Sequence, residues 1–454
     1  MPAGRGVQLS ARTAIVGGTV VAPDGSRRAD VLVEGALIRA VGEVDRNGAD
    51  TVEAGGCLVL PGAIDVHTHV FGGIRDDTRS ALCGGTTSAL AFVDALPGER
   101  PAEAARRTLA DEMPESLIDL AFHAVIWEPQ AYRRGDLAEA AALGVGSVKL
   151  WLAYLELGIQ ADDDVALRVM QEAAELGMVV LAHCENGRAI DVLTRQLVEQ
   201  GRLGIDSLPR SRPIELEAEC VHRFLILAGL AGATPYVVHL TGRAPLEEII
   251  AARGRGQTVH GEVCTHHLLF DRSHHEGDDA VRYVMTPPLR TGDDRQALLD
   301  GLRDGGVSTY ASDHCHLRLD RDKLPVLGDF TRIPTGMPGI GARLPLGFGL
   351  LSPEQLVEVA CAAPARIFGM YPRKGAIAAG SDADIVVWDP SAPSRLKLDV
   401  INDGLDWSPY EDARVQGSIR HVLAGGDHVV VDGRFGGDEH RGRYLPVSRV
   451  LETA

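Results

Sequence analysis

The sequence has few aromatic residues, no surplus of basic residues and no closely paired cysteines. Phe, Trp and Tyr make up 5% of its 454 residues, so the aromatic platforms on which nucleic-acid bases stack are not expected. Lys and Arg number 45 against 63 Asp and Glu, and the net charge of -18 argues against a nucleic acid or an anionic membrane as the main partner. The seven cysteines are scattered without a Cys-x-x-Cys pair, which indicates a reducing compartment without disulfides.

Long apolar segments are also missing. No run approaches the roughly 18 apolar residues that span a bilayer, and residues 1–12 lack the apolar centre of a secretory signal. We therefore expect a cytoplasmic protein. The hydrophobic content of 45% and charged content of 24% are typical of globular proteins, and the length exceeds that of one small module.

Both ends of the chain have the short β-rich runs of a small sheet domain. Turn residues separate these runs, and no helical period lies between them. They cover residues 13–21, 30–33 and 37–41 near the N-terminus, and 384–388, 418–424 and 429–431 near the C-terminus. We expect one β-sandwich built from residues 1–59 and 375–454, the second part including a tail.

The middle of the chain alternates short apolar runs with amphipathic helical segments. The apolar runs cover residues 63–66, 87–93, 118–126, 147–152, 178–182, 236–240, 258–263 and 308–311. Eight strands alternating with helices predict an α/β fold, a (β/α)8 TIM barrel over residues 60–374. An open doubly wound sheet is the alternative, but the Gly-x-Gly sequences at 254–256 and 339–341 lack the third glycine of a phosphate-binding turn.

Polar residues stand at the ends of several of these apolar runs. The carboxyl ends of barrel strands meet at one face, so these side chains should converge there. Residues 67 and 69 are two apart and point the same way from a strand. One such histidine alone is more often a core residue, but burying all of these groups is costly unless they bind something. The set comprises His67, His69, Lys149, His183, His239 and Asp313.

Lys149 lies inside an apolar strand, where burial favours the neutral amine. A neutral amine can capture carbon dioxide as a carbamate, an anion able to bridge two metal ions. Together with four imidazoles and one aspartate, it would make a binuclear Zn²⁺ site with the metals about 3.5–4 Å apart. The alternative is an ion pair between Lys149 and a nearby carboxylate.

These residues lie in motifs that resemble the amidohydrolase superfamily and, within it, the dihydropyrimidinase/hydantoinase group. The resemblance covers nearly the whole chain. Its motifs are Pro61-Gly-Ala-Ile-Asp-Val-His-Thr-His69, Gly84-Gly-Thr-Thr87, Ser147-Val-Lys-Leu-Trp-Leu-Ala-Tyr154, Ala182-His-Cys-Glu-Asn-Gly187, His239, Pro287-Pro-Leu-Arg290 and Ser312-Asp-His-Cys315. It implies a homotetramer and two divalent metal ions, expected to be Zn²⁺ with Mn²⁺ or Co²⁺ as alternatives.

The resemblance also assigns roles to the site residues. His67 and His69 would hold one metal with Asp313, while His183 and His239 hold the other and N6-carboxylated Lys149 bridges them. A hydroxide shared by the metals would attack the ring amide of a small cyclic amide. Asp313 would take its proton and deliver it to the leaving nitrogen.

The same resemblance implies a set of substrate contacts. Tyr154 would support the developing oxyanion, with packing above the barrel as the alternative. Thr286 and Thr335 match positions that hold the ring amide, largely through backbone contacts, and Trp151 and Phe71 would line the substrate pocket.

Three other functions compete with a dihydropyrimidinase or hydantoinase. Allantoinase stays open. Dihydroorotase would require arginine at position 71, which is Phe71, and an asparagine-bearing turn where the chain has Asp94-Ala-Leu-Pro97. A non-catalytic scaffold of the same fold would lack metal ligands, whereas this chain keeps all six.

Only fourteen residues separate His69 from Gly84, fewer than expected for the group. Because loops at this face of a barrel set substrate choice, we expect a non-standard cyclic amide or imide, with dihydrouracil a poor substrate. Alternatively, the loop at residues 317–338 fills the gap. Two further histidines, His266 and His267, are expected to support the mouth, and five are expected at the surface: His274, His275, His421, His428 and His440.

Overall fold

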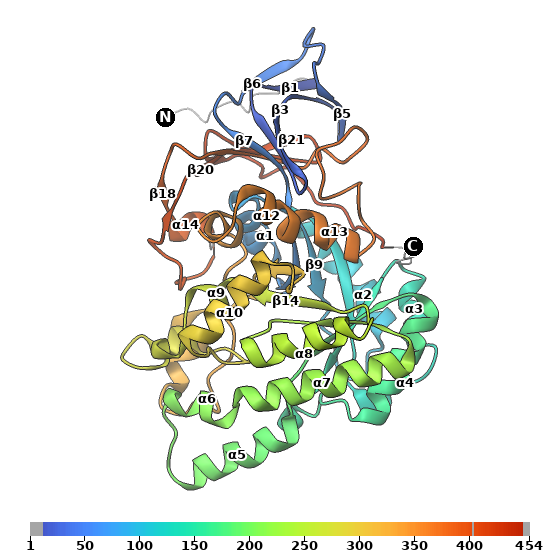
Figure 1. The fold of residues 1–454 in the computed structure, drawn as a ribbon, viewed down its shortest axis with the longest axis vertical. Coiled ribbons are helices and arrows are strands. Elements are labelled where there is room, and N and C mark those ends of the chain that lie inside the picture. Colours follow the sequence, from blue (N-terminus) through green and yellow to red (C-terminus); the bar gives the residue numbers. More distant parts are fainter. Residues whose placement is uncertain (1–11, 402–403, 448–454) are drawn as a thin grey trace.

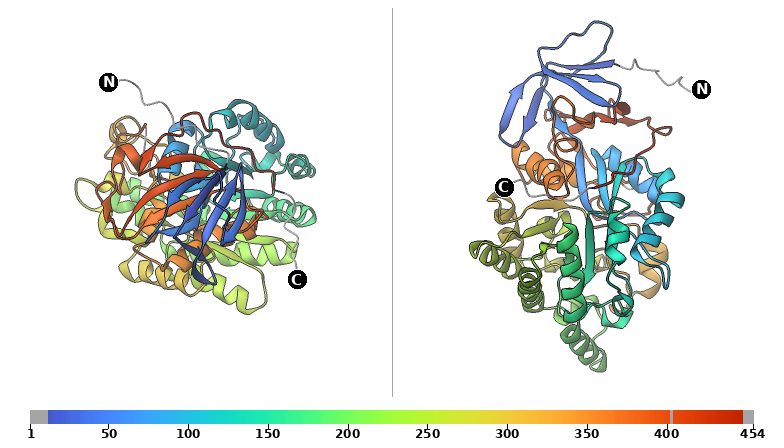
Figure 2. Two further views of the ribbon diagram at one scale, coloured as in Figure 1. Left: turned by 90° about the horizontal axis from the view of Figure 1, so that it is seen from above. Right: turned by 90° about the vertical axis from the view of Figure 1, so that its right-hand side faces the viewer.

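The computed structural model describes residues 12–401 and 404–447, and places a β-rich domain on a barrel surrounded by helices (Figure 1). The expectation about residues 1–12 falls almost wholly outside the described part. The side view in Figure 2 places the β-rich domain at one end of the molecule and the helices around the other. The expected α/β barrel with a small β-sandwich is therefore confirmed.

Eight parallel strands form the barrel in the order in which they occur along the chain. Their apolar side chains pack into a core inside the ring that includes Ile64, Phe92 and Leu181. The strands are β8 (Ala63–His69), β9 (Thr86–Phe92), β10 (Asp119–Val125), β11 (Ser147–Trp151), β12 (Val179–His183), β13 (Thr234–Val237), β14 (His260–Cys264) and β15 (Thr309–Ala311).

The ring closes between the first and last strands. The short strand β16 (His314–Cys315), just after β15, pairs in parallel with β8, His314 opposite Thr68. The backbone N–H of Ser312 also donates to Asp65 Oδ1, 3.1 Å away. The fully buried Arg343 donates from Nη1 to the carbonyl of Tyr310 on β15 at 2.7 Å, and its Nε lies 3.5 Å from Asp65 Oδ2 on β8. One guanidinium therefore joins both sides of the seam.

Helices cover the outer face of the ring because their apolar residues recur at helical spacing. In α4 (Asp163–Leu176), Val165, Val169 and Ala173 are spaced four apart and buried. The helix ends at Gly177 with φ +67°, a left-handed conformation that favours glycine. The other helices before the last strand are α1 (Ile74–Cys83), α2 (Pro101–Asp111), α3 (Asp136–Ala141), α5 (Gly187–Glu199), α6 (Leu208–Ser211), α7 (Ile214–Ala231), α8 (Arg243–Gly254), α9 (Thr265–Leu269) and α10 (Gly292–Arg303).

The β-rich domain consists of two sheets with strands from both ends of the chain in the larger one. The four-stranded sheet has the order β5 (Leu37–Gly42), β4 (Asp30–Glu34), β1 (Arg12–Val16) and β6 (Asp50–Glu53). The seven-stranded sheet has the order β22 (Arg434–Phe435), β21 (Asp427–Val431), β20 (Ser418–Ala424), β17 (Ile385–Asp389), β7 (Leu58–Pro61), β2 (Thr19–Ala22) and β3 (Gly25–Arg28). The view from above in Figure 2 shows the N-terminal and C-terminal strands crossing over one another.

The expected single strand over residues 13–21 is two strands, β1 and β2, which belong to different sheets. The chain breaks at Gly17, with φ +74°, and at Gly18, where a Cβ would lie 2.6 Å from a methyl group of Val59. Glycine is needed at both positions, first for the backbone conformation and then for the close packing. The division into domains at residues 59 and 374 stays a prediction.

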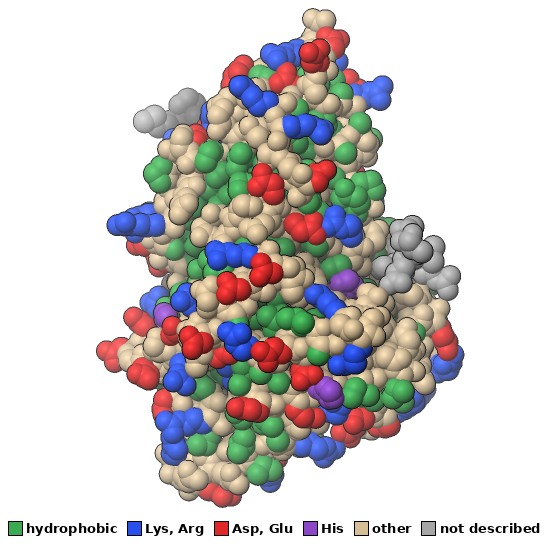
Figure 3. All heavy atoms as spheres, viewed as in Figure 1, with side chains coloured by type: hydrophobic (Ala, Val, Ile, Leu, Met, Phe, Trp, Pro, Cys, Tyr) green, Lys and Arg blue, Asp and Glu red, His purple; other side chains and the backbone are tan. Residues whose placement is uncertain are grey.

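The five histidines expected at the surface are not exposed. His275 and His421 are buried, and the other three are half-buried. His421 and His428 lie on β20 and β21 of the larger sheet, and His274 packs against the rings of Phe270 and Tyr283. On the face drawn in Figure 3, basic and acidic side chains are interspersed. Within the described residues, no helix has the length and apolar character needed to cross a bilayer.

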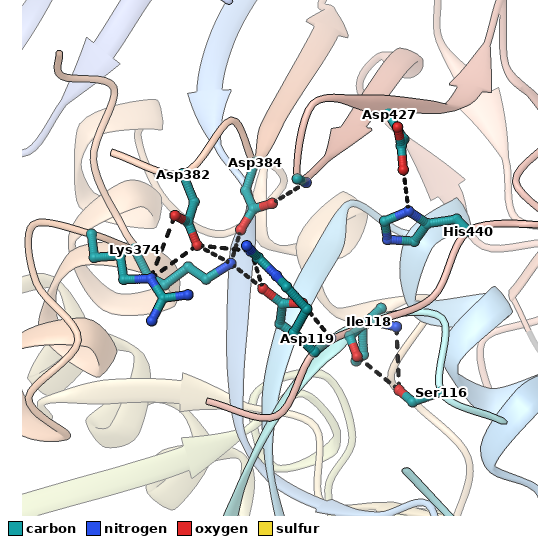
Figure 4. A network of polar contacts seen from close by, with 11 residues as sticks. Ser116, Ile118, Asp119, Lys374, Asp382, Asp384, Asp427 and His440 are labelled. Atoms are coloured by element: carbon teal, nitrogen blue, oxygen red, sulfur yellow. Dashed lines mark hydrogen bonds and ion pairs between the residues drawn. The ribbon is translucent and has the colours of Figure 1, made fainter. Parts of the chain in front are cut away.

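A buried ion network joins the barrel to the β-rich domain and the C-terminal segment (Figure 4). Lys374 Nζ lies 2.6 Å from Asp119 Oδ2, at the start of β10, and also pairs with Asp384 and with Asp382, the latter at 3.1 Å. Arg443 Nη2 is 2.7 Å from Asp119 and 2.9 Å from Asp382. All three carboxylates and Lys374 are buried, so the network depends on having both signs of charge present.

We predict that Lys374→Met lowers the free energy of unfolding by about 3–5 kcal/mol, because it leaves buried carboxylates without their cation. Chemical denaturation followed by circular dichroism measures this change. Lys397→Met is the control, since the Lys397–Asp412 pair at 2.7 Å is 60% exposed on both sides and should change stability by less than about 0.5 kcal/mol. Equal effects of the two substitutions would contradict the prediction.

Candidate metal centre

The first predicted ligand group lies at the seam of the barrel. His67 and His69 end β8, and Asp313 follows β15 with φ +48°, an unusual conformation for a residue other than glycine. Asp313 Oδ1 lies 3.0 Å from His67 Nε2 and 3.7 Å from His69 Nε2. One carboxylate oxygen and two imidazole nitrogens thus surround a common point, as a divalent cation requires.

The second predicted group lies at the ends of the next strands around the ring. His183 ends β12, while His239 lies two residues beyond β13, with φ +38°. Nδ1 of His183 and Nε2 of His239 are 3.0 Å apart, and the ring centroids are 4.7 Å apart. Two ring nitrogens that face each other need either a shared proton or a cation between them. Burial lowers the pKa of both imidazoles, which favours the neutral forms that bind metals.

Lys149 lies inside the barrel on β11 and is fully buried. Its Nζ has no hydrogen-bond partner among the described residues and lies 4.7 Å from the Phe92 ring centroid and 4.8 Å from that of Trp151. Burial lowers its pKa to about 8. The alternative of a direct ion pair with a carboxylate is not observed in the described part, so the amine is left available for modification.

Two buried glutamates that the sequence analysis did not single out fix the orientation of the histidines. Glu262 Oε1 is 2.6 Å from His67 Nδ1, and Glu185 Oε2 is 2.7 Å from His183 Nε2. Each leaves the opposite ring nitrogen facing the mouth, as in carboxylate–histidine pairs that support metals. Arg212 Nη1 in turn lies 2.5 Å from Glu185 Oε2. The sequence does contain a signal for both glutamates, because Glu262 interrupts the seventh apolar run and Glu185 follows His183 by two residues.

The charges of the group favour an additional cation. Burial alone would lower the pKa of His67, but the carboxylates of Glu262 and Asp313 outweigh it and raise the pKa to about 9. The imidazoles of His67, His239 and His69 conversely hold the pKa of Asp313 well below its usual range, against the effect of burial. The Asp313 carboxylate is thus ionised, and together with the neutral imidazoles of His183 and His239 it makes a ligand set that fits divalent metal ions.

The predicted substrate contacts are linked by hydrogen bonds beside this cluster. Tyr154 Oη is 2.6 Å from Thr286 Oγ1, and the Thr286 hydroxyl donates to Thr335 Oγ1 at 3.1 Å. Tyr154 has φ +68°, and its ring centroid lies 4.9 Å from that of His183. Burial raises the pKa of Tyr154, which keeps its hydroxyl protonated and able to donate a hydrogen bond.

The two predicted pocket aromatics lie in different places. Trp151 is at the mouth, with its ring centroid 5.5 Å from Tyr154 and 5.7 Å from Trp127. Phe71 instead packs edge-on against Phe122, with ring centroids 6.0 Å apart, and is partly buried against the core cluster that contains Phe122. The described ring contacts therefore do not bring Phe71 to the metal cluster.

The short loop after β8 packs against the segment that follows Asp313. A Cβ at Gly73 would lie 2.1 Å from the His316 ring, and His316 Nδ1 is 2.9 Å from Asp77 Oδ1. This packing holds the loop close to His316. The 317–338 segment has its own contacts, for example the backbone N–H of Leu319 donating to Asp406 at 2.9 Å.

We predict that Glu262→Gln weakens divalent metal binding by about 10–100-fold, because it loosens the orientation of His67. Competition with a chelator, followed by metal analysis, measures the affinity. Glu172→Gln is the matched control: Glu172 is also a buried glutamate, but it accepts from Tyr132 Oη at 2.5 Å, away from the histidines. Unchanged metal affinity in Glu262→Gln would show that the histidine does not need this support.

Comparison with known proteins agrees with this geometry. The model of the amidohydrolase family matches residues 58–429. A D-hydantoinase of Ralstonia pickettii is 36% identical over 95% of this chain and 98% of its own, and one of Streptomyces coelicolor is 35% identical over 96% and 98%. The solved structure of a dihydropyrimidinase from Brevibacillus agri has 33% identity and a TM-score of 0.92 over 97% of this chain and all of its own. The chain therefore belongs to the amidohydrolase family, in its hydantoinase group.

Proposed function

We propose that the protein is a metal-dependent hydrolase that opens the ring amide of a cyclic amide: a dihydropyrimidine, a hydantoin or a cyclic imide. The observation that carries the proposal is the convergence of four imidazoles, Asp313 and the Lys149 amine, next to the hydrogen-bonded Tyr154. The Lys149 amine has no hydrogen-bond partner among the described residues. The hydantoinase and dihydropyrimidinase names of the relatives support the same reaction class.

Two divalent ions would be held by the ligands that the sequence suggested. His67, His69 and Asp313 would bind one, His183 and His239 the other, and N6-carboxylated Lys149 both. Bound there, the metals would activate a water molecule and polarise the ring carbonyl. Zn²⁺ suits this mixture of imidazole and carboxylate ligands. The identity of the metal, the homotetramer and the cytoplasmic location rest on the sequence and the resemblance alone.

The protein's own side chains would then transfer protons and donate hydrogen bonds. The ionised carboxylate of Asp313 accepts a proton from the attacking water and passes it to the leaving ring nitrogen. The protonated hydroxyl of Tyr154 donates a hydrogen bond to the carbonyl oxygen as negative charge develops. Thr286 and Thr335, which are linked to Tyr154, would orient the ring amide.

The substrate would carry an apolar or aromatic substituent. The support is the pair of indoles, Trp127 and Trp151, which stand 5.7 Å apart next to Tyr154 and offer a broad apolar surface. By the resemblance, the short loop after β8 would remove one wall of the pocket; in the structure this loop lies against His316. Dihydrouracil lacks a group that would use this surface.

We predict that the protein, supplied with Zn²⁺ or Mn²⁺ and bicarbonate, opens the ring of at least one compound in a test panel. The panel contains dihydrouracil, hydantoin, phenyl-substituted hydantoin, allantoin, dihydroorotate and succinimide. A phenyl-substituted hydantoin should exceed dihydrouracil in kcat/KM, because its phenyl group can pack on Trp127 and Trp151. A kcat/KM for dihydrouracil of roughly 10⁴–10⁸ M⁻¹s⁻¹ would refute the substituent preference, and no turnover of any compound would refute the function.

Asp313→Asn should lower kcat by about 10²–10⁴-fold, because it removes the proton acceptor.

We predict that Lys149→Ala loses metal and activity, with partial rescue by short carboxylic acids that replace the carbamate. In the unsubstituted protein, isotope-labelled bicarbonate should give a carbamate carbon signal by NMR, and this signal should disappear in the variant. Lys323→Met is the matched control, because Lys323 is also buried with a pKa lowered to about 7, but its Nζ donates to the Val284 carbonyl at 2.9 Å. Full metal content in Lys149→Ala would exclude the bridging role.

A further inference from the structure

A second group of possible metal ligands lies at the end of β14, outside the proposed pair of metals. It consists of Cys264, the last residue of the strand, and His266 and His267 in the first turn of α9. All three side chains are buried, at 0%, 1% and 3% exposure. One possible ligand atom of each lies within 4.8 Å of one from both others. Sequence reasoning gave the two histidines only a supporting role.

The histidines of this group carry unused lone pairs. His267 Nε2 lies 3.2 Å from the carbonyl oxygen of Pro287, which only accepts, so Nε2 carries the proton and Nδ1 a free lone pair. His267 Nδ1 and both ring nitrogens of His266 are buried without a hydrogen-bond partner in the described part of the chain. Leaving these atoms buried and unpartnered is costly, so a bound species is expected to satisfy them.

We propose that Cys264, His266 and His267 form a third metal site, which binds a single Zn²⁺-type divalent cation separately from the proposed pair. A thiolate and two imidazoles are the ligands that Zn²⁺ and Co²⁺ prefer, and three protein ligands leave a fourth position for water. Binding would release the proton of the Cys264 thiol, because the thiolate is the ligand. The backbone carbonyl at Pro287 already orients His267 as such ligands usually are oriented.

The same sulfur has a second possible set of neighbouring ligands. Cys264 Sγ lies 3.7 Å from Glu262 Oε1, and Cys264, Glu262 and His67 form a second possible ligand group. Glu262 and His67 are already bonded to each other at 2.6 Å, however. The lone pairs of His266 and His267 have no such partner among the residues that the structure describes, which is why the third site is assigned to them.

A cation at this site would join two segments of the mouth. The end of β14 would be tied through His267 to Pro287, which directly follows Thr286. Thr286 is hydrogen-bonded to Tyr154, so the third ion would hold this hydroxyl pair in place. The site does not depend on the hydrolytic proposal, because none of its three ligands belongs to the proposed pair.

Cobalt substitution tests the third site in the whole protein. Apoprotein is loaded with Co²⁺ and bicarbonate, freed of excess metal, and examined by metal analysis and absorption spectroscopy. The proposed pair contains no sulfur ligand, so a thiolate-to-cobalt charge-transfer band in the near ultraviolet reports on Cys264. We expect this band and three Co²⁺ per chain. Two Co²⁺ per chain without the band would overturn the third site and leave the hydrolytic proposal untouched.

Variants identify the ligands. Cys264→Ser should abolish the band and lose one Co²⁺ per chain. His267→Gln should weaken the Co²⁺ affinity of the third site, measured by titration of the band, by more than about 100-fold. The controls are Cys361→Ser, a buried cysteine elsewhere, and His275→Gln, whose Nε2 also lies 3.2 Å from a carbonyl, that of Tyr283. Both controls should keep the band. A band with unchanged affinity in His266→Gln and His267→Gln would place the metal on Glu262 and His67, against the proposal.

Discussion

Closure of the parallel barrel is the constraint on which the site depends. The buried Arg343 contacts Asp65 on β8 and the Tyr310 carbonyl on β15, and Ser312 donates its N–H to the same aspartate. These contacts bring the first and last strands together at the mouth. Asp313 directly follows the last strand, and His67 lies on the first strand. The two side chains therefore meet only when the ring is closed, and the first metal group depends on this closure.

At the mouth of the barrel, buried carboxylates are paired with buried imidazoles. Glu262 and Glu185 each bind the outer nitrogen of a histidine, which turns the other nitrogen inward. Asp313 and His239 take left-handed backbone conformations to point their side chains at the centre. Such strained residues persist where the surroundings over-determine them, and here they occur at the proposed ligands.

The chemistry and the specificity of the site come from different parts of the fold. The ligands lie on or just after strands, where the barrel holds them rigidly. Trp127, Trp151 and the short loop after β8 lie at the rim, where changes of length and side chain leave the strands intact. The Cys264 group occupies an intermediate position, since it begins on a strand and continues into the first turn of α9.

The sequence by itself determined the barrel, the two-ended β-sandwich and the candidate ligands, because period and polar interruptions are local patterns. His67 and His69 are two residues apart, and Lys149 interrupts an apolar strand, so both are recognisable without coordinates. It did not separate β1 from β2, because the change of sheet at Gly17 and Gly18 depends on packing against Val59.

Only the tertiary structure decided which distant residues meet. Glu262 supports His67 from 195 residues away, and Tyr154 reaches Thr286 across 132 residues. It also directed Phe71 toward Phe122 and left Lys149 without an acidic hydrogen-bond partner in the described part of the chain. Such contacts join strands and loops that are far apart along the chain, and no local period encodes them; the closed ring brings them within bonding distance.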